Sequence, residues 1–217
     1  TLHQAGENSY ELKKVLDHYQ NQPEKLKAAR FLIANMPAHR TYVGKEIDSL
    51  KRMKKESIQK GRISDEIVAH WKSFDYSSSQ VVKNIDVIKA DILIENIDLA
   101  FEAWEKRSWS KQYSFEDFCE YVLPYRIGDE PLEKWRRIYY ERYSPVLDSL
   151  YQGNDVVEAA RVMANYLKEE GFTNHTDFNL PHLGALFLLE NRVGYCRDNC
   201  DIATYVMRSL GIPITMD

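Results

Sequence analysis

The feature that most constrains the fold is a helical periodicity of apolar residues that recurs over the first 170 positions. The clearest case is the stretch 90–107, which no proline interrupts and in which one helical face carries Leu93, Ile97, Ala100, Phe101 and Trp104. Similar stripes, separated by proline, glycine or serine, predict helices over 8–19, 23–37, 47–61, 64–77, 114–123, from 129 past 145, and 154–171. We therefore expect a multi-helical region over residues 1–171.

The pattern changes after Gly171, where we place a boundary, so that residues 172–217 form a second region. Pro181 opens a predicted helix through Glu190, a turn follows at Gly194, and a further helix is expected from Cys196 to Leu210. Residues 214–216 suggest a strand. The chain as a whole is expected to be mainly α-helical.

Composition excludes some classes of partner. Lys plus Arg number 29 against 33 Asp plus Glu among 217 residues, and the net charge of −4 offers no strong positive field for nucleic acid. No window approaches the roughly 18 apolar residues that a membrane span requires. The chain begins at Thr1 without methionine or a signal peptide, and an upstream segment removed on export would leave a periplasmic or cell-surface location open.

The chemistry of the sequence centres on Cys196, which stands at the predicted start of a helix. Unpaired backbone amides and the positive end of the helix dipole favour a thiolate at such a position. Gly194, two residues earlier, permits a sharp turn that can direct the sulfur into a cleft. A buried thiol that simply packs at the helix start is the competing interpretation.

The surrounding motif resembles the core of the transglutaminase-like superfamily of papain-like cysteine enzymes. The resemblance covers roughly the last 35 residues and is carried by Gly194-Tyr195-Cys196-Arg197-Asp198, Ala203, Arg208 and Gly211-Ile212-Pro213. A less specific similarity to the extended amino-terminal part of bacterial cell-envelope members of this superfamily is carried by residues 118–126 and 130–136.

The resemblance implies that residues 172–217 are the cysteine-helix portion of an α+β core that lacks most of its sheet. Cys196 then occupies the nucleophile position, and acyl transfer or hydrolysis of amide or peptide bonds proceeds through a thioester. The family's histidine and aspartate lie on strands after the Gly-Ile-Pro segment and are expected beyond Asp217, so this chain alone is expected to be inactive. Hydrolysis, deamidation and cross-linking remain equally compatible, on a peptide, a protein or a glycan-linked peptide, without a cofactor.

The other two cysteines are expected to be structural, and neither of the two nearest histidines fits the position of the catalytic base. Cys119 and Cys200 are expected to pack into the core, and a zinc site at Cys196 and Cys200 would need two further ligands, so no metal is expected. His175 and His182 both precede the cysteine, which conflicts with the family's chain order for the catalytic base.

The alternative function is a non-catalytic helical binding or scaffold module of the cell envelope that recognises peptide or glycan. It draws on the aromatic and arginine-rich run from Tyr121 to Tyr143, whose side chains are of the kind that anchor ligands. Helix packing, with Arg136 and Arg137 paired to Glu133 and Glu141, is the simpler interpretation of that run.

Overall fold

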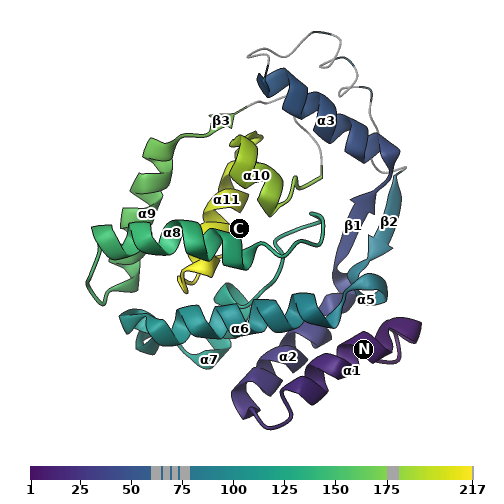
Figure 1. Ribbon diagram of the computed structural model, residues 1–217, viewed down its shortest axis with the longest axis vertical. Helices are drawn as coiled ribbons and strands as arrows, with labels where there is room; N and C mark the ends of the chain where they lie inside the picture. The colour runs from purple at the N-terminus through teal and green to yellow at the C-terminus, as the bar shows by residue number, and fades with distance from the viewer. Residues whose placement is uncertain (60–64, 66–68, 70–72, 74–78, 175–180, 217) are drawn as a thin grey trace.

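The computed structural model describes the chain except for residues 60–64, 66–68, 70–72, 74–78, 175–180 and 217, and it is mainly helical (Figure 1). The longer helices are α1 (Ser9–His18), α2 (Pro23–Asn35), α3 (Lys45–Gln59), α6 (Ala90–Lys106), α8 (Arg136–Leu150), α9 (Val156–Glu170), α10 (Ala185–Asn191) and α11 (Cys196–Ser209). Short helices are η1 (Gly6–Asn8), η2 (Met36–Ala38), α5 (Asn84–Val87), η4 (Ser108–Gln112), α7 (Phe115–Asp117) and the π-helical turn η5 (Phe118–Val122). Four short strands complete the set: β1 (Arg40–Val43), β2 (Gln80–Lys83), β3 (Thr173–Asn174) and β4 (Val193–Gly194).

The first apolar cluster packs α1 and α2 against α6, as the periodicity predicted. Leu93, Ile97, Ala100 and Phe101 of α6 are at most 2% exposed and meet the buried stripes of α1 and α2. Phe118 closes this cluster with its ring edge against Phe101. In Figure 1, α6 crosses the molecule between α1 and α2 on one side and α8 on the other.

The second apolar cluster surrounds α11. Tyr139 and Tyr143 of α8, Met163 of α9 and Leu188 of α10 pack with Tyr205 of α11, and all five are fully buried. Helices α8 and α9 therefore share a core with α10 and α11, across the boundary predicted near Gly171. The domain boundary itself stays a prediction. Helix α9 does stop there, because Gly171 follows its last residue as the C-cap with a φ of 82°, which suits glycine.

The Arg136 guanidinium connects the two clusters, and we call its set of hydrogen bonds the Arg136 clasp. It is 2% exposed, and it donates to the Asn96 side chain on α6 at 2.9 Å and to the Arg208 carbonyl on α11 at 2.7 Å. Its second amino group donates to the carbonyls of residues 122–124 at the end of η5. One buried cation thus makes hydrogen bonds to acceptors on three segments that are distant in sequence.

One strand pair corrects the expectation that the first 170 residues are entirely helical, and a second pair lies beyond them. β1 and β2 pair in antiparallel register, with Arg40 opposite Lys83 and Val43 opposite Gln80. β3 and β4 form a short parallel pair. The strand expected at 214–216 is wrong, because within the described part of the chain Ile214 makes only a single long backbone hydrogen bond, of 3.4 Å, to Tyr121.

Two helices begin later than their prolines suggested. The helix expected from Asp129 starts at Arg136, because the Glu130 carboxylate accepts from the amides of Ile127 and Gly128 and holds this segment in a loop. The helix expected from Pro181 starts at Ala185, after a glycine with φ of 91°. Long-range hydrogen bonds also hold both segments, from Thr41 to the Glu130 carbonyl and from the His182 amide to Asp129, and they outweigh the local helix-start signal.

Of the predicted helix caps, one is confirmed and two are wrong. Ser114 and Asp117 form the predicted capping box. The box predicted from Asn8 and Glu11 is wrong, because Asn8 donates to carbonyls near α5 and Glu11 accepts from the amide of Ala90. Asp155, rather than Asn154, caps α9. Most of the helix predicted over 64–77 lies outside the described residues.

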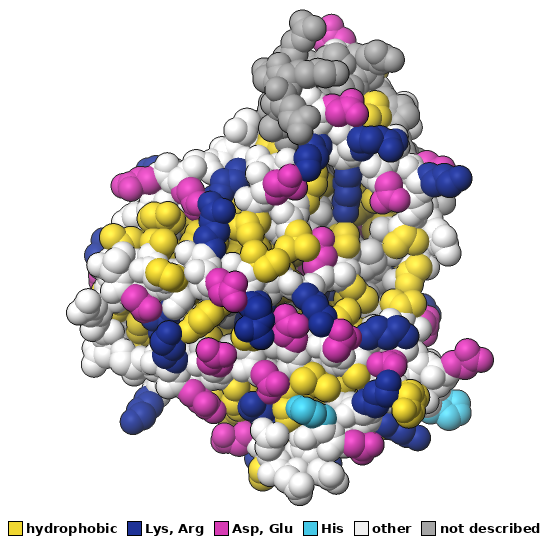
Figure 2. All heavy atoms as spheres, viewed as in Figure 1, with side chains coloured by type: hydrophobic (Ala, Val, Ile, Leu, Met, Phe, Trp, Pro, Cys, Tyr) yellow, Lys and Arg dark blue, Asp and Glu magenta, His cyan; other side chains and the backbone are white. Residues whose placement is uncertain are grey.

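The described helices include none that is both long and apolar enough to cross a membrane. Figure 2 shows basic and acidic side chains interspersed on the viewed face, with apolar side chains between them.

The Arg136 clasp predicts a large loss of stability on substitution. Arg136→Met should lower the free energy of unfolding by about 3 kcal/mol or more, because it removes charge-assisted hydrogen bonds to buried acceptors on α6, on α11 and in the segment 122–124. Arg137→Met is the matched control, since its side chain is 54% exposed and should cost less than about 1 kcal/mol. Urea unfolding of both variants measures the difference, and equal losses would contradict the role given to the clasp.

Candidate functional site

Cys196 is the first residue of α11, a helix of 14 residues, and its side chain is exposed. Tyr195 precedes it in extended conformation as the N-cap and is itself 38% exposed. The structure therefore places Cys196 where the sequence predicted it, at a helix start and open to solvent. The competing interpretation of a buried thiol at the helix start is wrong.

The turn before Cys196 is held by close packing between Gly194 and Asp198. A Cβ on Gly194 would lie 2.5 Å from Oδ2 of Asp198, so glycine is required here by lack of space rather than by its backbone angle. The same carboxylate oxygen accepts from the amide of Tyr195 at 2.8 Å. Asp198 is fully buried and thereby fixes the start of α11 against β4.

Cys200 lies one turn further along α11 and is also exposed, so the prediction that it packs into the core is wrong. Partial burial of its sulfur raises its pKa, and the charges of Asp201 and Cys196 add to that effect. The two thiols therefore share one exposed face of α11. Cys119 does pack into the core as predicted, and burial raises its pKa to about 12.

His182 contacts the opposite, buried face of α11. Its Nδ1 lies 2.6 Å from Oδ2 of Asp201, whose side chain is fully buried, and its backbone amide donates to Asp129 at 2.8 Å. Its ring packs so closely over Gly128 that a Cβ there would lie 2.3 Å from Nε2. Among described residues, no hydrogen bond joins a histidine to Cys196, and His175 lies outside them.

The pair of His182 and Asp201 favours a bound proton. Burial of His182 works against its charged form, but the hydrogen bond and negative charge of Asp201 outweigh burial and raise the pKa of His182. Asp201 was not predicted as a functional residue. The sequence pattern that could have indicated it is the spacing of Asp198, Asp201 and Tyr205, which puts all three on one face of a helix.

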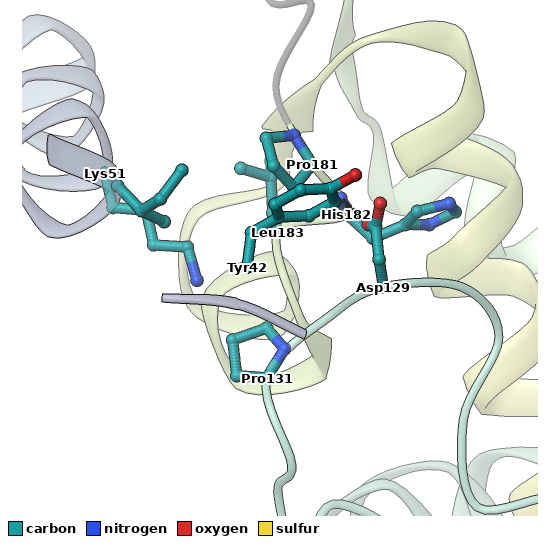
Figure 3. Close-up of a pocket in the computed structure, with 8 residues that line it drawn as sticks. Tyr42, Lys51, Asp129, Pro131, Pro181, His182 and Leu183 are labelled. Carbon is teal, nitrogen blue, oxygen red and sulfur yellow. Dashed lines mark hydrogen bonds between the residues drawn. The ribbon is translucent and has the colours of Figure 1, made fainter. Parts of the chain in front are cut away.

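A small cavity lies on the other side of His182, between α3, β1 and the segment 129–131 (Figure 3). Lys51 and Tyr42 face it, and the His182 imidazole points away from both. Burial lowers the pKa of Lys51, against the opposing charges of Glu133, Asp48 and Asp129. The cavity measures about 10 Å³, which is room for about one water, so it is not a substrate site.

The aromatic and arginine-rich run does not form an extended groove. Trp135, Tyr139 and Tyr143 are core residues, and Arg136 is buried in the clasp rather than paired with Glu133 or Glu141. The groove hypothesis and the intrahelical-pair interpretation are therefore both wrong for the centre of this run. Within the described ranges, no group of three or more His, Cys, Asp or Glu side chains is arranged to hold a metal ion.

Comparison with protein-family models, with curated proteins and with solved structures finds no match to the chain. The candidate site therefore rests on its own geometry. It consists of an exposed thiol at a helix start, a buried acid that fixes the turn, and the pair of partly buried His182 and buried Asp201 that holds the other face of the helix. Such an arrangement can present a nucleophilic sulfur on a rigid support.

The His182–Asp201 pair should stabilise the folded state more at low pH than at high pH. Because the pKa of His182 is raised above its ordinary value of 6.5, its stabilising contribution is complete below that value and is lost as pH rises through the folded-state pKa. His182→Gln should therefore cost more stability at about pH 5.5 than at about pH 8.5 in urea unfolding. His3→Gln, at an exposed position, controls for the loss of an imidazole as such, and an equal cost of His182→Gln at both pH values would exclude the charged pair.

Gly194→Ala should disturb the site through packing alone. The new methyl must displace Asp198, so we expect a loss of about 1–3 kcal/mol in unfolding free energy. Gly153→Ala provides the comparison, because its methyl would meet only the far end of the Tyr151 side chain, whose shift costs at most the exposed hydrogen bond from the Asp155 amide and its contact with Trp109. A Gly194→Ala variant as stable as Gly153→Ala would show that the turn tolerates a side chain.

Proposed function

We propose that the chain carries the nucleophile of a transglutaminase-like cysteine enzyme, and that Cys196 is the reacting residue. The observation that carries this proposal is the exposed Cys196 thiol at the first turn of α11, directly after the close-packed turn of Gly194 and Asp198. These residues belong to the motif by which the sequence resembles that superfamily. The function is acyl transfer or hydrolysis at an amide or peptide bond.

The chemistry follows from a thiolate attacking a carbonyl. The Cys196 sulfur forms a bond to the carbonyl carbon, the carbon–nitrogen bond breaks, and the amine leaves with a proton supplied by a general acid. The resulting thioester is then attacked by water, which gives hydrolysis or deamidation, or by a second amine, which gives cross-linking. Each outcome regenerates the Cys196 thiol.

Asp198 is a positioning residue in this proposal. Its carboxylate accepts from the Tyr195 amide and is fully buried, so it orients the turn that carries the sulfur and does not contact a substrate itself. His182 is not proposed as the base, because its Nε2 lies against Gly128 and, among the described residues, no hydrogen bond joins it to Cys196. The resemblance assigns the base and its orienting acid to strands that follow Pro213.

The substrate class follows from the same resemblance. We propose a peptide, a protein or a glycan-linked peptide as the acyl donor, bound at the cell envelope. Tyr195 at the N-cap is a large exposed side chain directly beside the nucleophile, and it is available to contact such a donor.

Alkylation of the three thiols tests the proposal within one molecule. After brief iodoacetamide treatment, peptide-resolved mass spectrometry should find Cys196 alkylated about tenfold faster than Cys200, and Cys119 protected. Cys200 is the matched control because it lies on the same exposed face of α11, and its raised pKa disfavours the reactive thiolate. Protection of Cys119 follows from its burial.

Equal rates at Cys196 and Cys200, or faster reaction at Cys200, would contradict a nucleophilic role for Cys196. That result would favour the non-catalytic binding module, in which α11 serves only as packed structure. Cys200→Ser should leave the alkylation rate at Cys196 within about twofold of the original. That result would show that the reactivity of Cys196 does not depend on the neighbouring thiol.

A further inference from the structure

Two free thiols, Cys196 and Cys200, lie one turn apart on the exposed face of α11. Residues four positions apart in an α-helix project from the same face, so the two sulfurs are neighbours. The charge of Cys196 contributes to the raised pKa of Cys200, as expected for thiols that lie close together. The pair can therefore take part in chemistry that uses two sulfurs at once, whereas the acyl transfer proposed for Cys196 needs only one.

The spacing of the two thiols is fixed by contacts on the opposite face of the helix. Asp198, which lies between the cysteines in sequence, is fully buried and accepts from the Tyr195 amide at 2.8 Å. Asp201, which follows Cys200, is also fully buried and lies 2.6 Å from Nδ1 of His182. Unwinding the first turn of α11 would disturb both contacts, so the thiols keep the separation of a regular helix.

This separation is too wide for a disulfide. The Cβ atoms of residues four positions apart in a helix lie about 5–6 Å from each other, whereas a disulfide requires about 3.5–4.5 Å. One ion between the sulfurs removes the mismatch, because two metal–sulfur bonds of about 2.3 Å in line place the sulfurs about 4.6 Å apart. The geometry of α11 thus favours a bridging ion over a direct bond between the sulfurs.

Two thiolates on their own select a soft ion of low coordination number. Structural zinc takes four ligands, and within the described ranges no further His, Cys, Asp or Glu side chain is arranged to complete a metal site with the pair. Cu(I) is soft, favours thiolate sulfur, and is satisfied by two sulfurs in a near-linear arrangement. A cation between the sulfurs also relieves the repulsion of two neighbouring thiolates, to which the charge of Asp201 adds.

We propose that Cys196 and Cys200 form a two-coordinate Cu(I) site on the exposed face of α11. Binding replaces the two thiol protons, which are released to solvent, and no electron is transferred. Copper held there occupies the Cys196 sulfur and blocks its attack on a carbonyl. The site uses the position of Cys196 and not its reactivity, so this proposal is tested separately from the function proposed above.

Anaerobic titration of the reduced, intact chain with Cu(I), in competition with the coloured chelator bicinchoninate, tests the proposal. The chain should withdraw one equivalent of Cu(I) from the chelator. Cys196→Ser and Cys200→Ser should each weaken binding at least about hundredfold, because each removes one of two ligands from an exposed position. Failure to withdraw copper, or an unchanged affinity in Cys200→Ser, would overturn the site.

Cys119→Ala is the matched control, because it removes the remaining thiol of the chain, which is buried in the core away from the pair. It should change the affinity for Cu(I) less than about twofold. A loss of affinity in Cys119→Ala as large as that in Cys200→Ser would overturn the assignment to the pair on α11.

Native mass spectrometry and X-ray absorption identify the ligands of the bound ion. One copper should be found per monomer, and the copper spectrum should show two sulfur neighbours. Copper-dependent dimers would overturn a site within one chain, because the ion would then lie between exposed thiols of two molecules. A third sulfur or a nitrogen bound to the copper, or Zn(II) bound as tightly as Cu(I), would overturn two-coordinate binding.

Discussion

The structure depends on one buried cation. Among the described residues, no carboxylate pairs with the Arg136 guanidinium, which is held instead by the Asn96 amide oxygen and by carbonyls at the end of η5 and on α11. Burial and the neighbouring Arg208 lower its pKa, which is the electrostatic cost of this arrangement. In return, three segments that are distant in sequence are fixed at one point, and α11 is joined to both apolar clusters.

Helix α11 has two chemically different faces as a consequence. Its buried face carries Asp198, Asp201 and Arg208, each bonded to a different loop: Asp198 to the turn at Tyr195, Asp201 to His182, and Arg208 to the Arg126 carbonyl. Its exposed face begins with two thiols one helical turn apart. A reactive sulfur placed there would sit on a support fixed by packing and hydrogen bonds, which is what a nucleophile requires.

Local sequence patterns predicted the elements that local interactions determine. The stripe over 90–107 and the helix from Cys196 to about Leu210 are found where the apolar period and the flanking glycines placed them. The errors arise where long-range bonds compete with local signals. Pro131 and Pro181 suggested helix starts, but Thr41 binds the Glu130 carbonyl and Asp129 binds the His182 amide, and these bonds keep both segments irregular. Strands β1 and β2 were missed because each is only four residues long and their pairing joins segments about 40 positions apart.

In the candidate site, too, local sequence predicted some features, and others depend on long-range contacts. The helix-start position of Cys196 follows from its own neighbours in sequence, whereas the partnership of His182 with Asp201 and the exposure of Cys200 depend on how the loops fold over α11. Periodicity placed Cys200 on the same helical stripe as Met207, which is buried. The same stripe also carries Cys196, and at this end of α11 it is exposed.

The most direct test of the central claim is covalent acylation of the thiols by p-nitrophenyl acetate, an activated ester that needs no general acid to expel its leaving group. Mass spectrometry of the intact chain and of its peptides should find one acetyl group, on Cys196, in the original protein and in Cys200→Ser, and none in Cys196→Ser. Acetylation spread evenly over Cys196 and Cys200, or retained in Cys196→Ser, would contradict the assignment of Cys196 as the nucleophile.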